Sequence, residues 1–71
     1  MLTPLEQLLE LYPDKQWHWT YLSSNHNITI EYINNNPDKP WNWTHISLNS
    51  NITMQFINNN PDKSWNWNYI S

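Results

Sequence analysis

The fold is decided by the sequence Asn-Pro-Asp-Lys-Pro-Trp-Asn-Trp, which occupies residues 36–43. Related stretches lie at residues 13–19 and 61–67, so that each position recurs after 24 residues. Each stretch carries a pair of tryptophans: Trp17 and Trp19, Trp41 and Trp43, and Trp65 and Trp67. A fixed period in this range is typical of proteins built from repeated structural units. The sequence therefore predicts a single repeat domain, residues 1–71, with units at residues 1–23, 24–47 and 48–71.

Composition limits what can hold so small a domain together. A chain of 71 residues buries only about 60% of the surface that it exposes when unfolded. It contains no cysteine, so neither a disulfide nor a thiolate metal site is available. Six Trp, four Tyr and one Phe make up 15% of the residues, and each such side chain can bury roughly 150–250 Å². We therefore expect aromatic packing to supply most of the stability.

Charge and hydropathy exclude several functional classes. The net charge is −3, with three Lys and no Arg, so no basic patch for duplex DNA can form. Glycine is absent, which argues against a phosphate-binding loop. Residues 1–6 lack the basic start of a secretory signal. No stretch approaches the roughly 18–20 apolar residues of a membrane span. We expect a non-secreted protein that binds neither duplex DNA nor membranes.

The first part of each unit has the spacing of a helix. In the last unit Ile52 and Phe56 are four residues apart, and Asn51 precedes them as a suitable N-cap. In the first unit, Thr-Pro-Leu-Glu at residues 3–6 has the form of a capping box with Pro at the first helical position. Thr3 corresponds to Asn27 and Asn51 in the 24-residue repeat, so the sequence predicts that helices also start at these two asparagines.

A second, shorter helix is predicted over residues 39–47. The Asn residues and Pro that precede it end the first helix, because a residue before Pro is disfavoured in helical geometry. Asp38 is the expected N-cap, with Pro40 in the first turn. Trp43 and Ile46 are three residues apart and share one face.

A competing interpretation assigns strands to residues 28–30, which are β-branched, and 41–45, which alternate in polarity. The helical interpretation is favoured because the leucine-rich residues 5–10 suit a helix far better than a strand. The predicted fold class is therefore all-α, as a short α-solenoid of three stacked two-helix units.

Stacking would bury faces that a lone helix pair leaves exposed. We expect Trp19, Trp43 and Trp67 to form a ladder, and the amides of Asn36 and Asn60 to bond to the backbone of the neighbouring unit. The first unit, with Glu6, Glu10 and several leucines, would be an N-terminal cap. The last unit would present an apolar face that either drives self-association or is covered by the chain itself. The residues of that face are Ile52, Phe56, Trp67 and Ile70.

Two motifs carry a resemblance to a known group of proteins. One is Asn-x-Asn-Ile-Thr at residues 25–29 and 49–53, and the other is Asn-Pro-Asp-Lys-Pro-Trp-Asn-Trp-x-x-Ile-Ser at residues 36–47. They resemble short Trp- and Asn-rich repeats found in many copies in proteins of giant DNA viruses of the mimivirus-like groups. The middle and last units match closely and the first loosely. The resemblance implies a viral protein, in the cytoplasm of an infected host cell or in the virion, and brings no activity with it.

Two sets of residues are candidates for binding a partner. Trp17, Trp41 and Trp65 lie off the face shared by Trp43 and Ile46, so of the six tryptophans these three are better placed to be exposed and to stack on sugars or nucleobases. The favoured interpretation is that all six tryptophans pack in the core or between units, because a small domain without cysteine needs that buried area. Lysines at the same period could form a line, or could simply pair with the adjacent aspartates. These lysines are Lys15, Lys39 and Lys63.

No catalytic or metal-binding pattern is evident. The histidines lack the helical spacing of metal ligands, and the serine that closes each unit has no matched His and acid partners. The period of these serines suits a cap or turn instead. Glu6 and Glu10 lie on one helix in the expected cap, and paired acid catalysis there is not expected. The residues considered were His18, His26, His45, Ser23, Ser47 and Ser71.

Two functions follow from these observations. The first is a non-enzymatic structural or protein-interaction repeat without cofactors, which binds a protein partner or itself, as a homo-oligomer or a filament. The second is a ligand-binding module that uses a tryptophan ladder for glycans or single-stranded nucleic acid.

Overall fold

Six short α-helices form the regular structure of residues 1–70, the part of the chain that the computed structural model describes. No strand occurs in this range, so the all-α prediction is confirmed and the strands considered at residues 28–30 and 41–45 are wrong. Ser71, the third of the unit-closing serines, lies outside the described residues. The helices are α1 (Pro4–Leu11), α2 (Trp19–Ser24), α3 (Ile30–Asn35), α4 (Trp43–Ile46), α5 (Met54–Asn59) and α6 (Trp67–Ile70).

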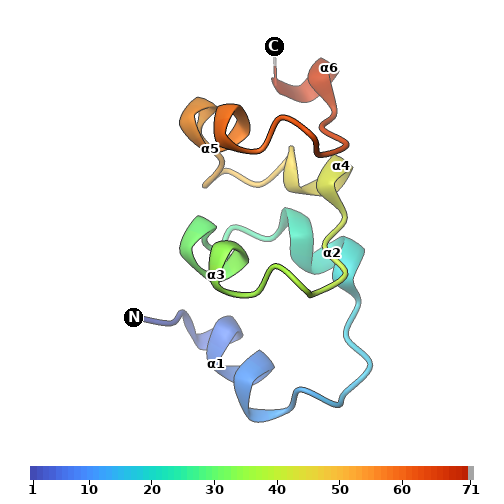
Figure 1. Cartoon of the computed structure of the whole chain (residues 1–71). Coiled ribbons are helices and arrows are strands. Elements are labelled where there is room, and N and C mark those ends of the chain that lie inside the picture. The colour runs from blue at the N-terminus through green and yellow to red at the C-terminus, as the bar shows by residue number, and fades with distance from the viewer. Residues whose placement is uncertain (71) are drawn as a thin grey trace.

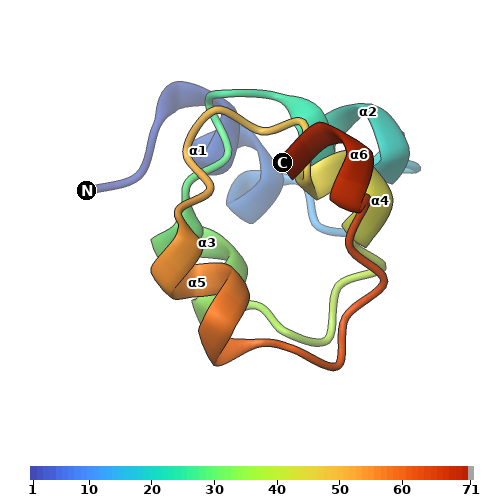
Figure 2. The same cartoon turned by 90° about the horizontal axis from the view of Figure 1, so that it is seen from above.

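The helices lie in two columns, with α1, α3 and α5 on one side and α2, α4 and α6 on the other (Figure 1). Figures 1 and 2 together place α5 above α3 and α6 above α4, whereas α1 is displaced to one side in the view from above. Helices α2 and α4 pack directly against each other. The described chain measures 35 × 23 × 19 Å, and α1 and α6 lie at opposite ends of it (Figure 1).

A threonine begins each helix of the first column. The hydroxyls of Thr3, Thr29 and Thr53 each accept a hydrogen bond from the amide three residues later. The capping box of α1 is therefore confirmed. The predicted starts at Asn27 and Asn51 are wrong, because these asparagines belong to the turn that precedes the helix and the N-cap comes two residues later. Helix α1 begins two repeat positions earlier than α3 and α5, so it is longer at its N-terminal end.

The second helix of the middle unit is shorter than predicted. It begins at Trp43 rather than within residues 39–42, and its N-cap is Asn42, whose side chain accepts from the His45 amide at 3.1 Å. Asp38 is not the N-cap. Two successive turns occupy the preceding segment: the Lys39 amide bonds to the Asn36 carbonyl at 3.2 Å, and the Trp41 amide to the Lys39 carbonyl at 2.8 Å. These bonds hold the segment out of helical geometry.

The apolar core is continuous through all three units. Its aromatic members meet edge to face, as in the pair Tyr32 and Trp41, whose ring centroids are 6.2 Å apart. Such contacts add about 0.5–1.5 kcal/mol beyond the area that they bury. The buried apolar residues are Leu9, Leu22, Ile28, Tyr32, Ile33, Trp41, Ile46, Phe56, Ile57 and Trp65.

Candidate interface at the C-terminal end

The first tryptophan of each pair folds back onto the end of the preceding helix. The indole N–H of Trp41 donates to the carbonyl of Asn36 at 2.9 Å, and that of Trp65 to the carbonyl of Asn60 at 2.8 Å. Trp17 makes the same bond to Tyr12 at 2.9 Å. Each of these carbonyls also accepts from the backbone amide three residues later, so the indole adds a second hydrogen bond to an acceptor just past the helix end.

This contact buries two of the three first tryptophans, which agrees with the favoured interpretation that the tryptophans pack inside and not with their exposure. Trp41 and Trp65 are only 7% and 6% exposed, and Trp17 is half-buried. The prediction considered which helical face they would occupy, but these residues precede the helix and pack inward to reach the carbonyl. In this structure Trp41 and Trp65 offer no open ring face on which a sugar or nucleobase could stack.

In the first two units, the second tryptophan of the pair packs against the next unit. Trp19 packs edge to face against Trp41 with centroids 5.1 Å apart, and Trp43 packs in the same way against Trp65 at 5.3 Å. Trp67, the equivalent residue of the last unit, is 56% exposed. The exposure of this position therefore rises at the C-terminal end of the described chain.

Two of the three candidate lysines contact tryptophan rings. The ammonium of Lys15 lies 5.4 Å from the ring centroid of Trp17, and that of Lys63 lies 4.9 Å from the ring of Trp43. Both arrangements are favourable cation–π contacts. Lys39 is half-buried. The contact of Lys63 with Trp43 crosses from the last unit to the middle one, so this lysine helps to join units.

The units are joined by a pair of asparagines. The side-chain amide of Asn49, which is 3% exposed, donates to the backbone carbonyls of Ser23, Asn25 and Ile28 at 3.1, 2.9 and 3.1 Å. The amide of Asn51 donates to the carbonyls of His26 and Ile28 at 2.7 and 2.8 Å. Every bond spans 21–26 residues, so the last unit is bound to the loop one period earlier.

Asn36 and Asn60 do not have the predicted role. Their amides donate to the carbonyls of Tyr32 and Phe56, four residues earlier in the same unit, at 2.9 and 2.8 Å. Each one closes its own helix instead of reaching a neighbouring unit. The residues that do reach across belong to the Asn-x-Asn motif, whose 24-residue period was the available signal.

The unit-closing serines of the first two units also link units. The hydroxyl of Ser23 accepts from the Asn42 amide at 2.9 Å, and that of Ser47 accepts from the Asn66 amide at 2.8 Å. Each hydroxyl also donates to a carbonyl four residues earlier. The serines therefore cap the turn that precedes the second helix of the next unit.

Glu6 holds the first unit to the second. One carboxylate oxygen accepts from the Thr3 amide at 2.9 Å, and the other accepts from the amide and the hydroxyl of Thr29 at 2.7 and 2.9 Å. Glu6 thus caps the starts of α1 and α3 together, and it is 1% exposed. It does not contribute to the polar outer surface expected of an N-terminal cap. Leu8 and Leu11 of the same helix are 45% and 69% exposed.

A hollow of about 220 Å³ opens at the C-terminal end. We call its lining the C-terminal face. Ile52 and Ile70, two of the predicted self-association residues, belong to it. Phe56 does not line the hollow and packs in the core at 5% exposed, and Trp67, which is 56% exposed, does not line it either. The lining residues are Ser47, Asn49, Ile52, Thr53, Met54, Ile57, Tyr69 and Ile70.

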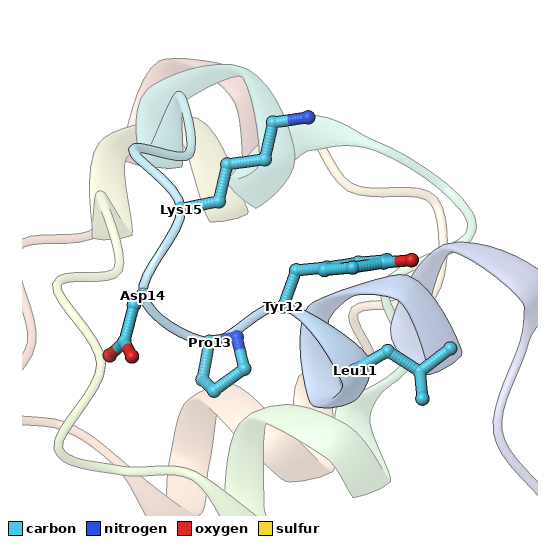
Figure 3. A pocket seen from close by; sticks show the side chains of 5 residues that line it. All are labelled: Leu11, Tyr12, Pro13, Asp14 and Lys15. Atoms are coloured by element: carbon cyan, nitrogen blue, oxygen red, sulfur yellow. The ribbon is translucent and has the colours of Figure 1, made fainter.

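A second hollow, of about 320 Å³, lies at the turn after α1 and is lined by residues 11–15. Figure 3 shows that the carboxylate of Asp14 and the ammonium of Lys15 point in opposite directions. Its polar groups therefore do not converge on a common point, as a ligand site requires. Among the described residues no cluster of His, Cys, Asp and Glu is arranged to hold a metal ion.

Tyr32 is the group whose protonation is most clearly altered. Burial raises the pKa of its hydroxyl from 10.0 to about 12, and the carboxylates of Glu10 and Glu6 add to the shift. The folded protein thus holds this proton more tightly than the unfolded chain does. The free energy of unfolding should therefore be unaffected by Tyr32 below pH 10 and should fall as the pH rises from 10 to about 12.

Urea denaturation at a series of pH values would measure this fall. Tyr32→Phe should flatten the alkaline decline, whereas Tyr21→Phe, at a residue that is 69% exposed, should leave it intact. An identical alkaline decline in the two variants would show that Tyr32 does not cause it.

Comparison of the chain with protein-family models, curated proteins and solved structures found no match. The resemblance to viral repeats therefore stays a prediction. Within the described range, no helix combines the length and apolar character needed to cross a membrane.

Proposed function

We propose that the protein is a non-enzymatic, protein-binding repeat module, a short α-solenoid whose C-terminal face accepts a repeat unit carried by another chain. One observation supports this most strongly. Shifted by 24 residues, the C-terminal face corresponds to the surface that the last unit covers within the chain.

The exposure of equivalent residues supports the correspondence. Ile28 and Ile46 are 0% exposed beneath the last unit, whereas their equivalents Ile52 and Ile70 are only half-buried. Met54 and Tyr69, which also line the face, are each 57% exposed. Residues of the middle unit that the last unit buries thus have counterparts in the last unit that are more exposed among residues 1–70. Covering the C-terminal face removes apolar area from water, which contributes about 25 cal/mol per Å².

Binding of a peptide with the sequence of residues 48–71 to the full chain would test this function. We expect saturable changes in the amide resonances of the C-terminal face in NMR spectra of the ¹⁵N-labelled chain. Met54→Lys in the labelled chain should abolish binding, since the ammonium would have to be buried in an apolar contact. Tyr21→Lys, at an exposed aromatic residue on α2, is the matched control and should bind normally.

The proposal is wrong if the peptide does not bind. It is equally wrong if the peptide binds the Met54→Lys and Tyr21→Lys chains with the same affinity, because the C-terminal face would then not be the contact.

A further inference from the structure

Within the chain, a set of three backbone carbonyls recognises one side chain. The carbonyl oxygens of Ser23, Asn25 and Ile28 converge on the carboxamide nitrogen of Asn49. A carboxamide nitrogen carries two hydrogens and is a donor only, whereas a carboxylate has no hydrogen to give. Three carbonyl oxygens that point at one site therefore favour the side chain of asparagine, which donates to them. They disfavour the carboxylate of aspartate, which has the same shape but no hydrogen to donate.

The same backbone geometry recurs at the C-terminal face. In the earlier turn the Ile28 amide bonds to the Asn25 carbonyl at 2.9 Å, and in the later turn the Ile52 amide bonds to the Asn49 carbonyl at 3.1 Å. In both turns the asparagine side chain also accepts from the amide two residues later, at 2.9 Å. By the 24-residue register the carbonyls of Ser47, Asn49 and Ile52 are the counterparts of the first set, and we call them the C-terminal carbonyl triad. The turn is shared at the Asn and Ile positions, whereas Ser23 lies within α2 and Ser47 follows the end of α4.

The C-terminal carbonyl triad lies beside the 220 Å³ hollow, since all three of its residues line that hollow. None of the side chains of residues 1–70 donates a hydrogen bond to these three carbonyls, whereas the earlier set receives three from Asn49. The site therefore has the acceptors of the internal contact and the space for the incoming group.

We propose that the C-terminal carbonyl triad binds the side-chain carboxamide of an Asn-x-Asn segment on another chain, in the way that Ser23, Asn25 and Ile28 bind Asn49. This inference rests on the proposed function and names its partner: a repeat unit that begins with two asparagines separated by one residue. The second amide would occupy the place that Asn51 has on His26 and Ile28. The first unit carries Met1 and Thr3 at these two positions, so its own sequence does not match the site.

Variants of the peptide of residues 48–71 test the inference. Asn49→Asp in the peptide replaces the donor by an acceptor of the same shape, and we expect binding to the full chain to weaken by at least about tenfold. Asn58→Asp in the peptide makes the same change of charge at a residue that is exposed on α5, and its affinity should stay within about twofold of the unmodified peptide.

The outcomes separate the two proposals. If Asn49→Asp binds as well as the unmodified peptide, or if both variants weaken equally, the carboxamide is not recognised and the inference is overturned while the protein-binding function stands. If the unmodified peptide does not bind the face, both are overturned. Loss confined to Asn49→Asp, with amide shifts at residues 47–53 of the labelled chain, supports the inference.

Discussion

Asn49→Asp in the full chain should lower the free energy of unfolding by about 3 kcal/mol or more. The change removes three hydrogen bonds from a side chain that is 3% exposed and directs a carboxylate at three carbonyl oxygens. An unsatisfied buried polar group costs about 1–3 kcal/mol, and a charged group costs more. For a domain this small, with a stability of roughly 5–15 kcal/mol or less, such a loss is a large part of the total.

Urea denaturation followed by tryptophan fluorescence would measure the loss, and Asn25→Asp provides a matched control. Asn25 has the same place in the preceding turn, where its side-chain oxygen accepts from the Asn27 amide at 2.9 Å. An aspartate can still accept that bond, so we expect a change below about 1 kcal/mol. Equal losses in the two variants would mean that the contact between units contributes nothing beyond the local turn.

Glu6→Gln should lower the free energy of unfolding by about 2 kcal/mol. The two carboxylate oxygens accept three hydrogen bonds and cap two helices, whereas glutamine offers one acceptor oxygen and turns an NH₂ group toward the remaining donors. Hydrogen bonds to charged groups contribute about 1.5–3 kcal/mol each, and losing an N-cap costs about 1 kcal/mol. The same urea titration applies.

Glu10→Gln is the control for the lost charge, because Glu10 lies on the same helix and is exposed. We expect it to change stability by less than about 0.5 kcal/mol. If Glu6→Gln were equally harmless, α1 would have to be held to the middle unit by its leucines and by the hydrogen bond from the Thr3 hydroxyl to the Asn27 carbonyl.

The sequence predicted a helix start correctly where the residues that make the start all belong to one helix. The capping box at residues 3–6 depends on contacts between neighbours in sequence, and it formed as expected. The asparagines behaved differently. Asn27 and Asn51 are good N-caps in isolation, but Asn51 donates its amide to the backbone of another unit, and threonine caps the helix instead. The preference of asparagine for N-cap positions could not reveal this, because the carbonyls that accept from the Asn51 amide lie 23–25 residues earlier in the chain.

The tryptophans show the same limit. Their period was plain in the sequence, but which member of each pair would be more exposed could not be read from helical spacing, and Trp41 and Trp65 are the more buried members of their pairs. An indole N–H can bond to any carbonyl within reach, and which carbonyl is available depends on how the chain turns after the helix. The turns at residues 36–41 bring Trp41 to the Asn36 carbonyl and so bury its ring.

The sequence by itself determined that the chain is helical, that its pattern recurs every 24 residues and that aromatic rings replace covalent links. Only the tertiary structure decided which polar groups join the units and which apolar face is left open. Helical propensity and capping act between neighbouring residues and can be read locally. The bonds of Glu6, Asn49 and Asn51 instead depend on backbone groups that approach only after the units have come together.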